Sequence, residues 1–169
     1  MPPSPLTLVW TWQRFADLGV HGVYDMLALR AKVFILEQGP FLDPDGIDPQ
    51  CWHLLGRDGA GALRAYLRVV DGGIKYPEPS MGRVVLDKPL RGTGLADSLV
   101  AEGLARCAAC WPGLGNRISA QAHLQPFYSR HGFVSVGEAY TEDTIPHIEM
   151  WRPPDPTPSH SPTQPPEIR

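Results

Sequence analysis

The sequence lacks several features that identify other classes of protein. Its 169 residues contain no run of the roughly 20 apolar residues that a membrane-spanning helix needs. It also lacks the clusters of lysine and arginine typical of nucleic-acid-binding proteins, and its formal net charge is −3. We therefore expect neither a membrane protein nor a nucleic-acid-binding protein. An anionic ligand must be held by local geometry rather than by the overall charge.

Cysteine is scarce and occurs in an odd number, at Cys51, Cys107 and Cys110, which indicates free thiols in a reducing compartment. Cys107 and Cys110 have the spacing of redox and zinc motifs, but no second pair completes a zinc site. We interpret the cysteines as structural thiols. The first five residues have neither the charged segment nor the apolar run of a secretory signal. These features predict a cytoplasmic location.

The length suits one domain that buries a core without disulfide or metal support. We predict that residues 6–152 form this domain. Residues 153–169 are rich in proline and polar side chains, a composition that cannot build a packed core. They are predicted to be a disordered tail.

Between these limits, strand and helix patterns alternate. Strands are predicted at residues 6–14, 51–57, 62–71, 82–86, 117–122, 133–141 and 147–151. Helices are predicted at residues 20–36, 91–110 and 124–131. The order indicates an α/β (α+β) fold with a mixed sheet and helices packed on it.

The most informative motif is a glycine-containing loop that connects a short apolar strand to the helix predicted at residues 91–110. Backbone N–H groups at the start of a helix, with two glycines and Arg91 nearby, form a site for an anion such as a phosphate. A dinucleotide fingerprint requires a third glycine and a distant acidic residue, and a P-loop requires Gly-Lys-Ser/Thr. Both are absent, which leaves the pattern Arg91-x-x-Gly94-x-Ala96.

This pattern resembles the coenzyme A pyrophosphate loop of the GCN5-related N-acetyltransferases (GNAT). The run Gln125-Pro-Phe-Tyr-Ser-Arg-His-Gly-Phe133 resembles a second hallmark of that superfamily. Residues 29–38 resemble a segment common in its first helix, and three further runs, at residues 43–48, 119–125 and 142–150, resemble its ElaA-type branch. The resemblance covers roughly residues 8–152. It implies a mostly antiparallel, twisted sheet of six to seven strands flanked by about four helices.

The resemblance also implies which residues hold acetyl-CoA. The strand Val84-Val85-Leu86 would pair with the pantetheine, and one of its N–H groups would polarise the thioester carbonyl. The N–H groups of Gly92, Thr93, Gly94, Leu95 and Ala96 would hold the pyrophosphate, with positive charge from Arg91. Gln121 stands where many relatives carry an asparagine that contacts the coenzyme, and Thr93 stands where a basic residue is common.

Catalytic residues are expected among the polar side chains near this site. The resemblance implies that Tyr128 is the general acid that protonates the leaving thiolate. The alternative is that Tyr128 is a half-buried tyrosine with a structural role. A base must also take a proton from the amine. His147 and Glu37 are candidates, with a structural histidine and a solvated carboxylate as alternatives. Other candidates are His53, His123, Glu142 and Asp143. The last two could attract a cationic amine.

Asp43, Asp45 and Asp48 are spaced like part of a calcium loop, but the glycine and glutamate of an EF-hand are missing at their required positions. An Asx turn is predicted there instead, and no metal site is expected.

The sequence thus predicts an enzyme that transfers the acetyl group of acetyl-CoA to a primary amine by direct attack in a ternary complex. One alternative is a non-catalytic sensor of acyl-CoA. Another is an enzyme similar to the acyl-homoserine-lactone synthases. The acceptor and the oligomeric state stay open, with a homodimer as one option.

Overall fold

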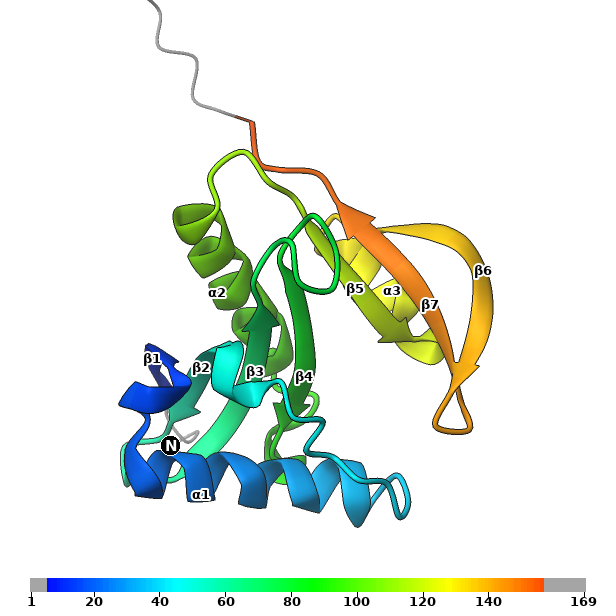
Figure 1. Ribbon diagram of the computed structural model, residues 1–169. Coiled ribbons are helices and arrows are strands. Elements are labelled where there is room, and N and C mark those ends of the chain that lie inside the picture. The colour runs from blue at the N-terminus through cyan, green and yellow to red at the C-terminus, as the bar shows by residue number, and fades with distance from the viewer. Residues whose placement is uncertain (1–5, 157–169) are drawn as a thin grey trace, which may run out of the picture.

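The computed structural model describes residues 6–156, which form seven strands and three α-helices (Figure 1). The strands are β1 (Val9–Arg14), β2 (Trp52–Arg57), β3 (Leu63–Val70), β4 (Ser80–Leu86), β5 (Asn116–Gln121), β6 (Val134–Glu142) and β7 (Ile145–Arg152). The helices are α1 (Gly19–Arg30), α2 (Leu95–Cys110) and α3 (Gln125–Arg130). The predicted order of strands and helices is confirmed, with element ends shifted by a few residues and with three α-helices rather than about four.

The strands divide between two sheets, with orders β1-β2-β3-β4 and β5-β7-β6. Every strand pair within these sheets is antiparallel, whereas the sequence predicted one mixed sheet. The division falls between β4 and β5. These strands are joined near their starts, where the Arg117 amide donates to the Pro79 carbonyl over 3.1 Å. Beyond this point the two strands separate (Figure 1).

Two helices cover opposite faces of the four-stranded sheet. Leu54 packs in the cluster that includes Leu99 and Val100 of α2, whereas Leu55 packs in the cluster that includes Met26 of α1. Successive strand residues point to opposite faces, so a strand covered on both sides is apolar almost throughout. Burial of a leucine side chain stabilises the fold by about 1.5–3 kcal/mol. Both faces of the sheet therefore contribute to the core.

The helix predicted at residues 20–36 is not a single α-helix. α1 ends at Arg30, and residues Ala31–Ile35 form one π-helical turn in which the Leu36 amide donates to the Ala31 carbonyl. Such wider turns occur frequently at functional sites.

The helix predicted to begin at Arg91 begins at Leu95 instead. Gly92 and Gly94 have φ angles of 78° and 84°, which a right-handed helix does not contain. The residues from Arg91 to Gly94 therefore form a loop in front of α2.

None of the helices in the described part of the chain is long and apolar enough to cross a membrane. The predicted disordered tail falls largely on residues 157–169, which lie outside the described residues. Its disorder and the domain boundary at residue 152 stay predictions.

Candidate active site

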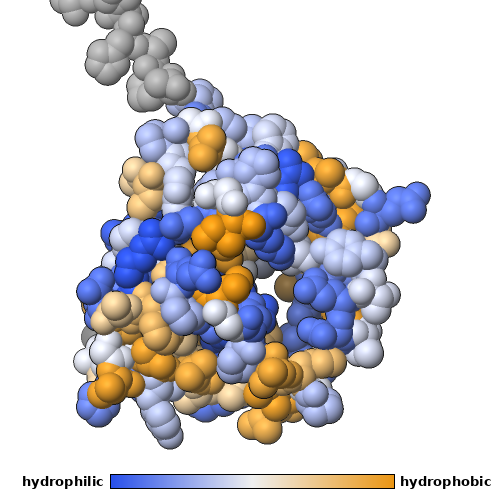
Figure 2. Space-filling view, in the orientation of Figure 1, coloured by the Kyte–Doolittle hydropathy of each residue, from blue (hydrophilic) through white to orange (hydrophobic). Residues whose placement is uncertain are grey.

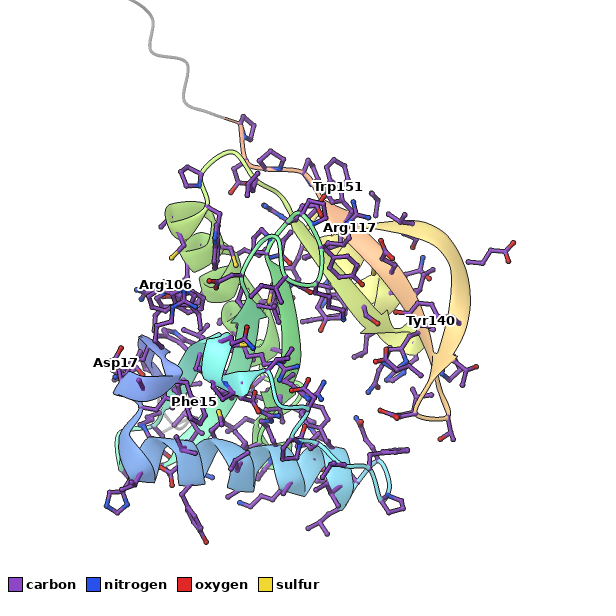
Figure 3. The ribbon with its side chains drawn as sticks, in the orientation of Figure 1. Phe15, Asp17, Arg106, Arg117, Tyr140 and Trp151 are labelled. Atoms are coloured by element: carbon purple, nitrogen blue, oxygen red, sulfur yellow. The ribbon has the colours of Figure 1, made fainter. Side chains whose placement is uncertain are left out.

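A cavity of about 150 Å³ lies where β4 and β5 separate. Its walls come from β4, β5, the residues after α1, and the hairpin that joins β6 to β7. In Figure 2 the molecule is hollowed between the side formed by β4 and the side formed by this hairpin. At the closed end, Arg117 of β5 forms an ion pair with Glu78, just before β4 (3.0 Å), and a second one with Glu149 of the neighbouring β7 (2.7 Å; Figure 3 labels Arg117).

Tyr128 of α3 lines this cavity, and the residue is 7% exposed. Its ring packs edge-on against Phe127 and Phe133, with centroids 5.1 and 5.9 Å apart. Within residues 6–156 its hydroxyl has no hydrogen-bond partner. Burial raises the pKa of Tyr128, so the hydroxyl stays protonated at neutral pH. A hydroxyl without a protein partner, on a residue that lines a cavity, is available to a ligand.

His147 of β7 also lines the cavity. Its Nδ1 lies 2.8 Å from the carbonyl oxygen of Ile145. Because a carbonyl can only accept, Nδ1 donates, and the lone pair of the neutral ring is then on Nε2. The ring stacks on Tyr140 of β6, which Figure 3 places on the hairpin (centroids 6.1 Å). His147 is thus held in place while Nε2 can accept a proton.

Glu37 does not line the cavity and instead forms an ion pair with Arg91 of the glycine loop. The hydrogen bonds from Arg91 lower the pKa of Glu37, which makes its carboxylate a weaker base. The next residue, Gln38, does line the cavity and accepts a hydrogen bond from Gln121 of β5 over 3.1 Å. Residues 37 and 38 therefore connect the glycine loop to the far wall of the cavity.

The strand expected to bind pantetheine contains a β-bulge. Tyr66 pairs with Val85 and Arg68 pairs with Gly82, so Arg83 and Val84 together oppose a single residue of β3. Arg83 has φ 49°, which is uncommon for a residue other than glycine. A bulge leaves its extra residue outside the ladder of hydrogen bonds. Backbone groups that would pair with β3 are thereby released where β4 lines the cavity.

The side chains of the predicted coenzyme strand point in different directions. Val84 lines the cavity, whereas Val85 and Leu86 are buried in the two cores. β4 nevertheless leads from the cavity to the glycine loop, because Arg91 donates to the carbonyl of Leu86 over 3.4 Å. The cavity and the loop therefore lie along one strand.

The loop formed by residues 91–96 is open to ligands. Gly94 is the N-cap of α2 and provides no side-chain hydrogen bond, so the first amides of the helix lack a capping group. A Cβ atom built at Gly92 or Gly94 would meet nothing within 4 Å. Thr93 donates its hydroxyl to the Leu90 carbonyl over 2.6 Å. Free amides at a helix N-terminus, with open space around them, fit the diphosphate of a coenzyme.

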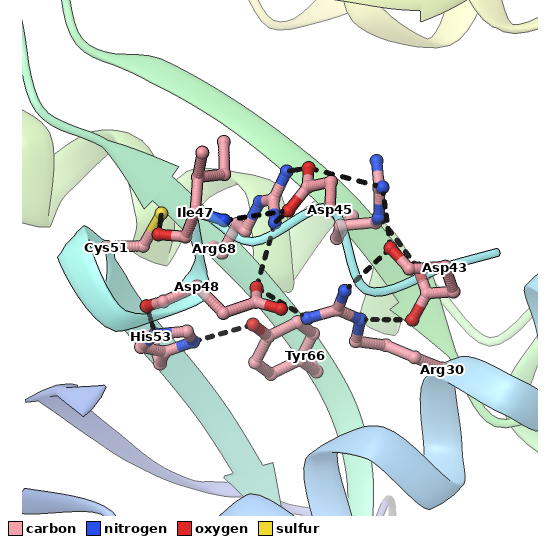
Figure 4. Close-up of polar contacts among 10 residues, drawn as sticks. Arg30, Asp43, Asp45, Ile47, Asp48, Cys51, His53, Tyr66 and Arg68 are labelled. Atoms are coloured by element: carbon pink, nitrogen blue, oxygen red, sulfur yellow. Dashed lines mark hydrogen bonds and ion pairs between the residues drawn. The ribbon is translucent and has the colours of Figure 1, made fainter. Parts of the chain in front are cut away.

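A buried network of ion pairs lies beneath the segment that connects α1 to β2 (Figure 4). One oxygen of Asp43 accepts from Nε of Arg30 and the other from Nε of Arg83, both over 2.8 Å. Asp48 accepts from Arg30 (2.7 Å) and Arg68 (2.8 Å). Arg30 is 0% exposed, and Asp43 is 5% exposed. The network therefore fastens the end of α1 to the bulge of β4.

The Asx turn predicted in this segment is confirmed, because the Asp45 carboxylate accepts from the Ile47 amide over 3.2 Å. Asp45 also pairs with Arg68. Burial alone would raise the pKa values of Asp45 and Asp48, but hydrogen bonds from the arginines lower both below their usual range. These carboxylates are therefore neutralised by guanidinium groups.

Of the predicted site residues, the structure brings six to the cavity: Val84, Gln121, Tyr128, Glu142, Asp143 and His147. Arg83 is not among the residues predicted for the site, and the sequence contains no signal for the bulge. Most of the glycine loop lies on the surface, beyond the cavity lining.

The separated sheets and the glycine loop are the arrangement expected of an N-acyltransferase of the GNAT type. Residues 61–152 match the sequence profile of the acetyltransferase (GNAT) domain, and the chain belongs to this family. The fold implied by the sequence resemblance is thus confirmed.

Specific relatives point to the ElaA-type branch. A UPF0039 protein of Synechocystis is 46% identical over 142 residues, which cover 83% of this chain and 92% of the relative. Protein ElaA of Escherichia coli is 38% identical over 146 residues, covering 85% and 95%, and its crystal structure superposes with a TM-score of 0.80. An acyl-CoA N-acyltransferase from Pseudomonas aeruginosa has a TM-score of 0.81 at 40% identity, covering 86% and 99%.

Proposed function

We propose that this protein is an N-acetyltransferase that transfers the acetyl group of acetyl-CoA to a primary amine in a ternary complex. The observation that carries the proposal is Tyr128, a buried residue whose protonated hydroxyl has no partner within residues 6–156 and which lines the cavity between β4 and β5. The proposal includes a cytoplasmic location and requires no metal ion. A homodimer remains an option.

Acetyl-CoA would bind along β4. The pantetheine would pair with the backbone of Val84, Val85 and Leu86, and the diphosphate would bind the amides of residues 92–96. Arg91 would add positive charge at the diphosphate, and Gln121 would contact the coenzyme from β5. An N–H group of the bulge at Arg83 and Val84 would stabilise the oxyanion of the tetrahedral intermediate.

His147 and Tyr128 would move the protons. The amine nitrogen attacks the thioester carbonyl, forms the C–N bond and loses a proton to Nε2 of His147. Collapse of the intermediate breaks the C–S bond, and the thiolate takes the hydroxyl proton of Tyr128. We assign the base to His147 rather than to Glu37, because Arg91 occupies the Glu37 carboxylate.

The test is thiol release from acetyl-CoA with a panel of amines, using the full chain and Tyr128→Phe. We expect kcat to fall by about 10²–10⁴-fold in this variant while coenzyme affinity changes little. Tyr24→Phe on the exposed face of α1 is the control. Unchanged turnover of Tyr128→Phe across the pH range would refute the general-acid role. Tight coenzyme binding without thiol release for any amine would favour a sensor.

A further inference from the structure

The acidic side chains of this protein are mostly ion-paired, and the exceptions are informative. In residues 6–156 nearly every aspartate and glutamate lies within ion-pair distance of an arginine or histidine. The exceptions are Asp17, Glu138, Glu142 and Asp143. Glu142 and Asp143 are adjacent, and both line the cavity. The cavity therefore has a rim with uncompensated negative charge.

The other charged groups that line the cavity do not neutralise this rim. Arg83 is the guanidinium among the lining residues, and it pairs with Asp43 and Asp45 in the network beneath. The imidazole among the lining residues is that of His147, which donates from Nδ1 to a carbonyl oxygen. Glu142 and Asp143 are thus free to attract a cation from solvent.

The Glu142 carboxylate is held by a hydrogen bond, and the backbone that carries Asp143 is held in a tight turn. The hydroxyl of Ser119 donates to Glu142 over 3.1 Å and also contacts the hydroxyl of Tyr140. Asp143 and Thr144 have φ angles of 49° and 62°, typical of the tight two-residue turn that joins hairpin strands. A carboxylate that is already held, such as that of Glu142, loses little conformational entropy when it binds a ligand.

The carboxylates of the rim are not suited to bind the amine group that reacts. A carboxylate beside an ammonium raises the pKa of that ammonium, whereas the reacting amine must lose its proton. Tyr128, which is buried and without a partner, marks the inner end of the cavity, while Glu142 and Asp143 are exposed. The reacting amine and the charge attracted by the rim are therefore two separate groups.

Apolar side chains line another part of the cavity. Phe34, Phe41 and Leu42 come from the π turn and the segment after it, and Leu42 is 86% exposed. This surface suits a methylene chain rather than a polar linker. The cavity volume of about 150 Å³ suits a small molecule.

We propose that the acceptor is a small diamine, in which a methylene chain joins the reacting amine to a second ammonium bound by Glu142 and Asp143. This inference rests on the proposed acetyl transfer and specifies its substrate class. The second ammonium contributes to binding and takes no part in the chemistry.

The test compares monoamines and diamines of equal chain length, such as pentylamine and 1,5-diaminopentane, in the thiol-release assay with the full chain. Exposed ion pairs are weak individually, so two carboxylates predict roughly a tenfold higher kcat/KM for the diamine at low salt. The ratio should fall in about 0.5 M salt, because exposed charges are screened.

The variant Glu142→Gln/Asp143→Asn should bring the ratio of the two kcat/KM values close to one, mainly through KM for the diamine. Glu138→Gln is the matched control, because Glu138 is also unpaired and lies on β6 but does not line the cavity. A wild-type ratio near one, or a ratio that the double variant leaves unchanged, overturns this inference alone. Absence of thiol release with every amine overturns the proposed function as well.

Discussion

Glu37 and Arg91 form a bidentate ion pair between the segment after α1 and the glycine loop before α2. Oε2 of Glu37 lies 2.7 Å from Nη1 of Arg91, and Oε1 lies 3.1 Å from Nη2. Both side chains are partly exposed, at 30% for Glu37 and 42% for Arg91. A diphosphate bound at the loop would compete with this carboxylate for the guanidinium.

The first prediction follows from this competition. Glu37→Gln removes the competing charge, so we expect the dissociation constant for coenzyme A to fall by about two- to fivefold at low salt, the range for an exposed ion pair. Isothermal titration calorimetry measures this dissociation constant. Glu102→Gln is the control, because Glu102 pairs with Arg106 on α2, away from the loop. Weaker binding by Glu37→Gln would contradict the prediction.

The second prediction concerns the proposed base. His147→Gln keeps a polar side chain but removes the nitrogen that accepts the proton, so we expect kcat to fall by about 10²-fold or more. The measurement is the rate of thiol release at saturating acetyl-CoA. His123→Gln, on an exposed residue outside the cavity lining, should keep the wild-type rate.

The third prediction concerns the buried network. Asp43→Asn leaves Arg30, which is fully buried, with one carboxylate partner instead of two. Breaking a buried pair by removing one charge costs about 3–5 kcal/mol, so urea unfolding should show a loss near the lower end of that range. Asp25→Asn is the control, because Asp25 and Arg57 are partly exposed and their pair is worth about 1 kcal/mol or less. Equal losses for both variants would contradict the prediction.

The fourth prediction concerns acid stability. The folded protein lowers the pKa values of Asp45 and Asp48 below those of the unfolded chain, which are about 4. Their contribution to stability is therefore complete above about pH 5 and is lost as the pH falls through 4 towards the folded pKa values. We expect the Tm, followed by circular dichroism, to decline steeply below about pH 4. In Asp45→Asn the decline should be shallower, whereas Asp17→Asn, on an unpaired residue, should follow the wild type.

Local patterns predicted the elements well and the glycine loop in particular. Residues close in sequence determine the helix after residue 94, the loop with its two glycines, and the helix that carries Tyr128. Propensity and periodicity report such features directly. The predicted start of α2 lies four residues too early, because the sequence pattern is compatible with both glycines in the helix and only their φ angles exclude this.

The parts of the site that could not be predicted depend on partners far apart in the sequence. Glu37 and Arg91 are 54 positions apart, and Arg83 and Asp43 are 40 apart. No periodicity records such pairs. The bulge at Arg83 could not be predicted from the sequence either, because arginine has no preference for a positive φ angle. Arg83 adopts one here with its side chain fixed by Asp43.

Arg30 does not line the cavity, yet the Asp43 carboxylate connects it to Arg83 at the bulge. In a survey of variants, a substitution at position 30 would first be classified as damage to the hydrophobic core. A second mutation that restores folding, but not the positive charge at position 30, would leave Asp43 with a single arginine partner. Some variants at position 30 should therefore fold but catalyse slowly. A survey that measures only the amount of folded protein would not detect them.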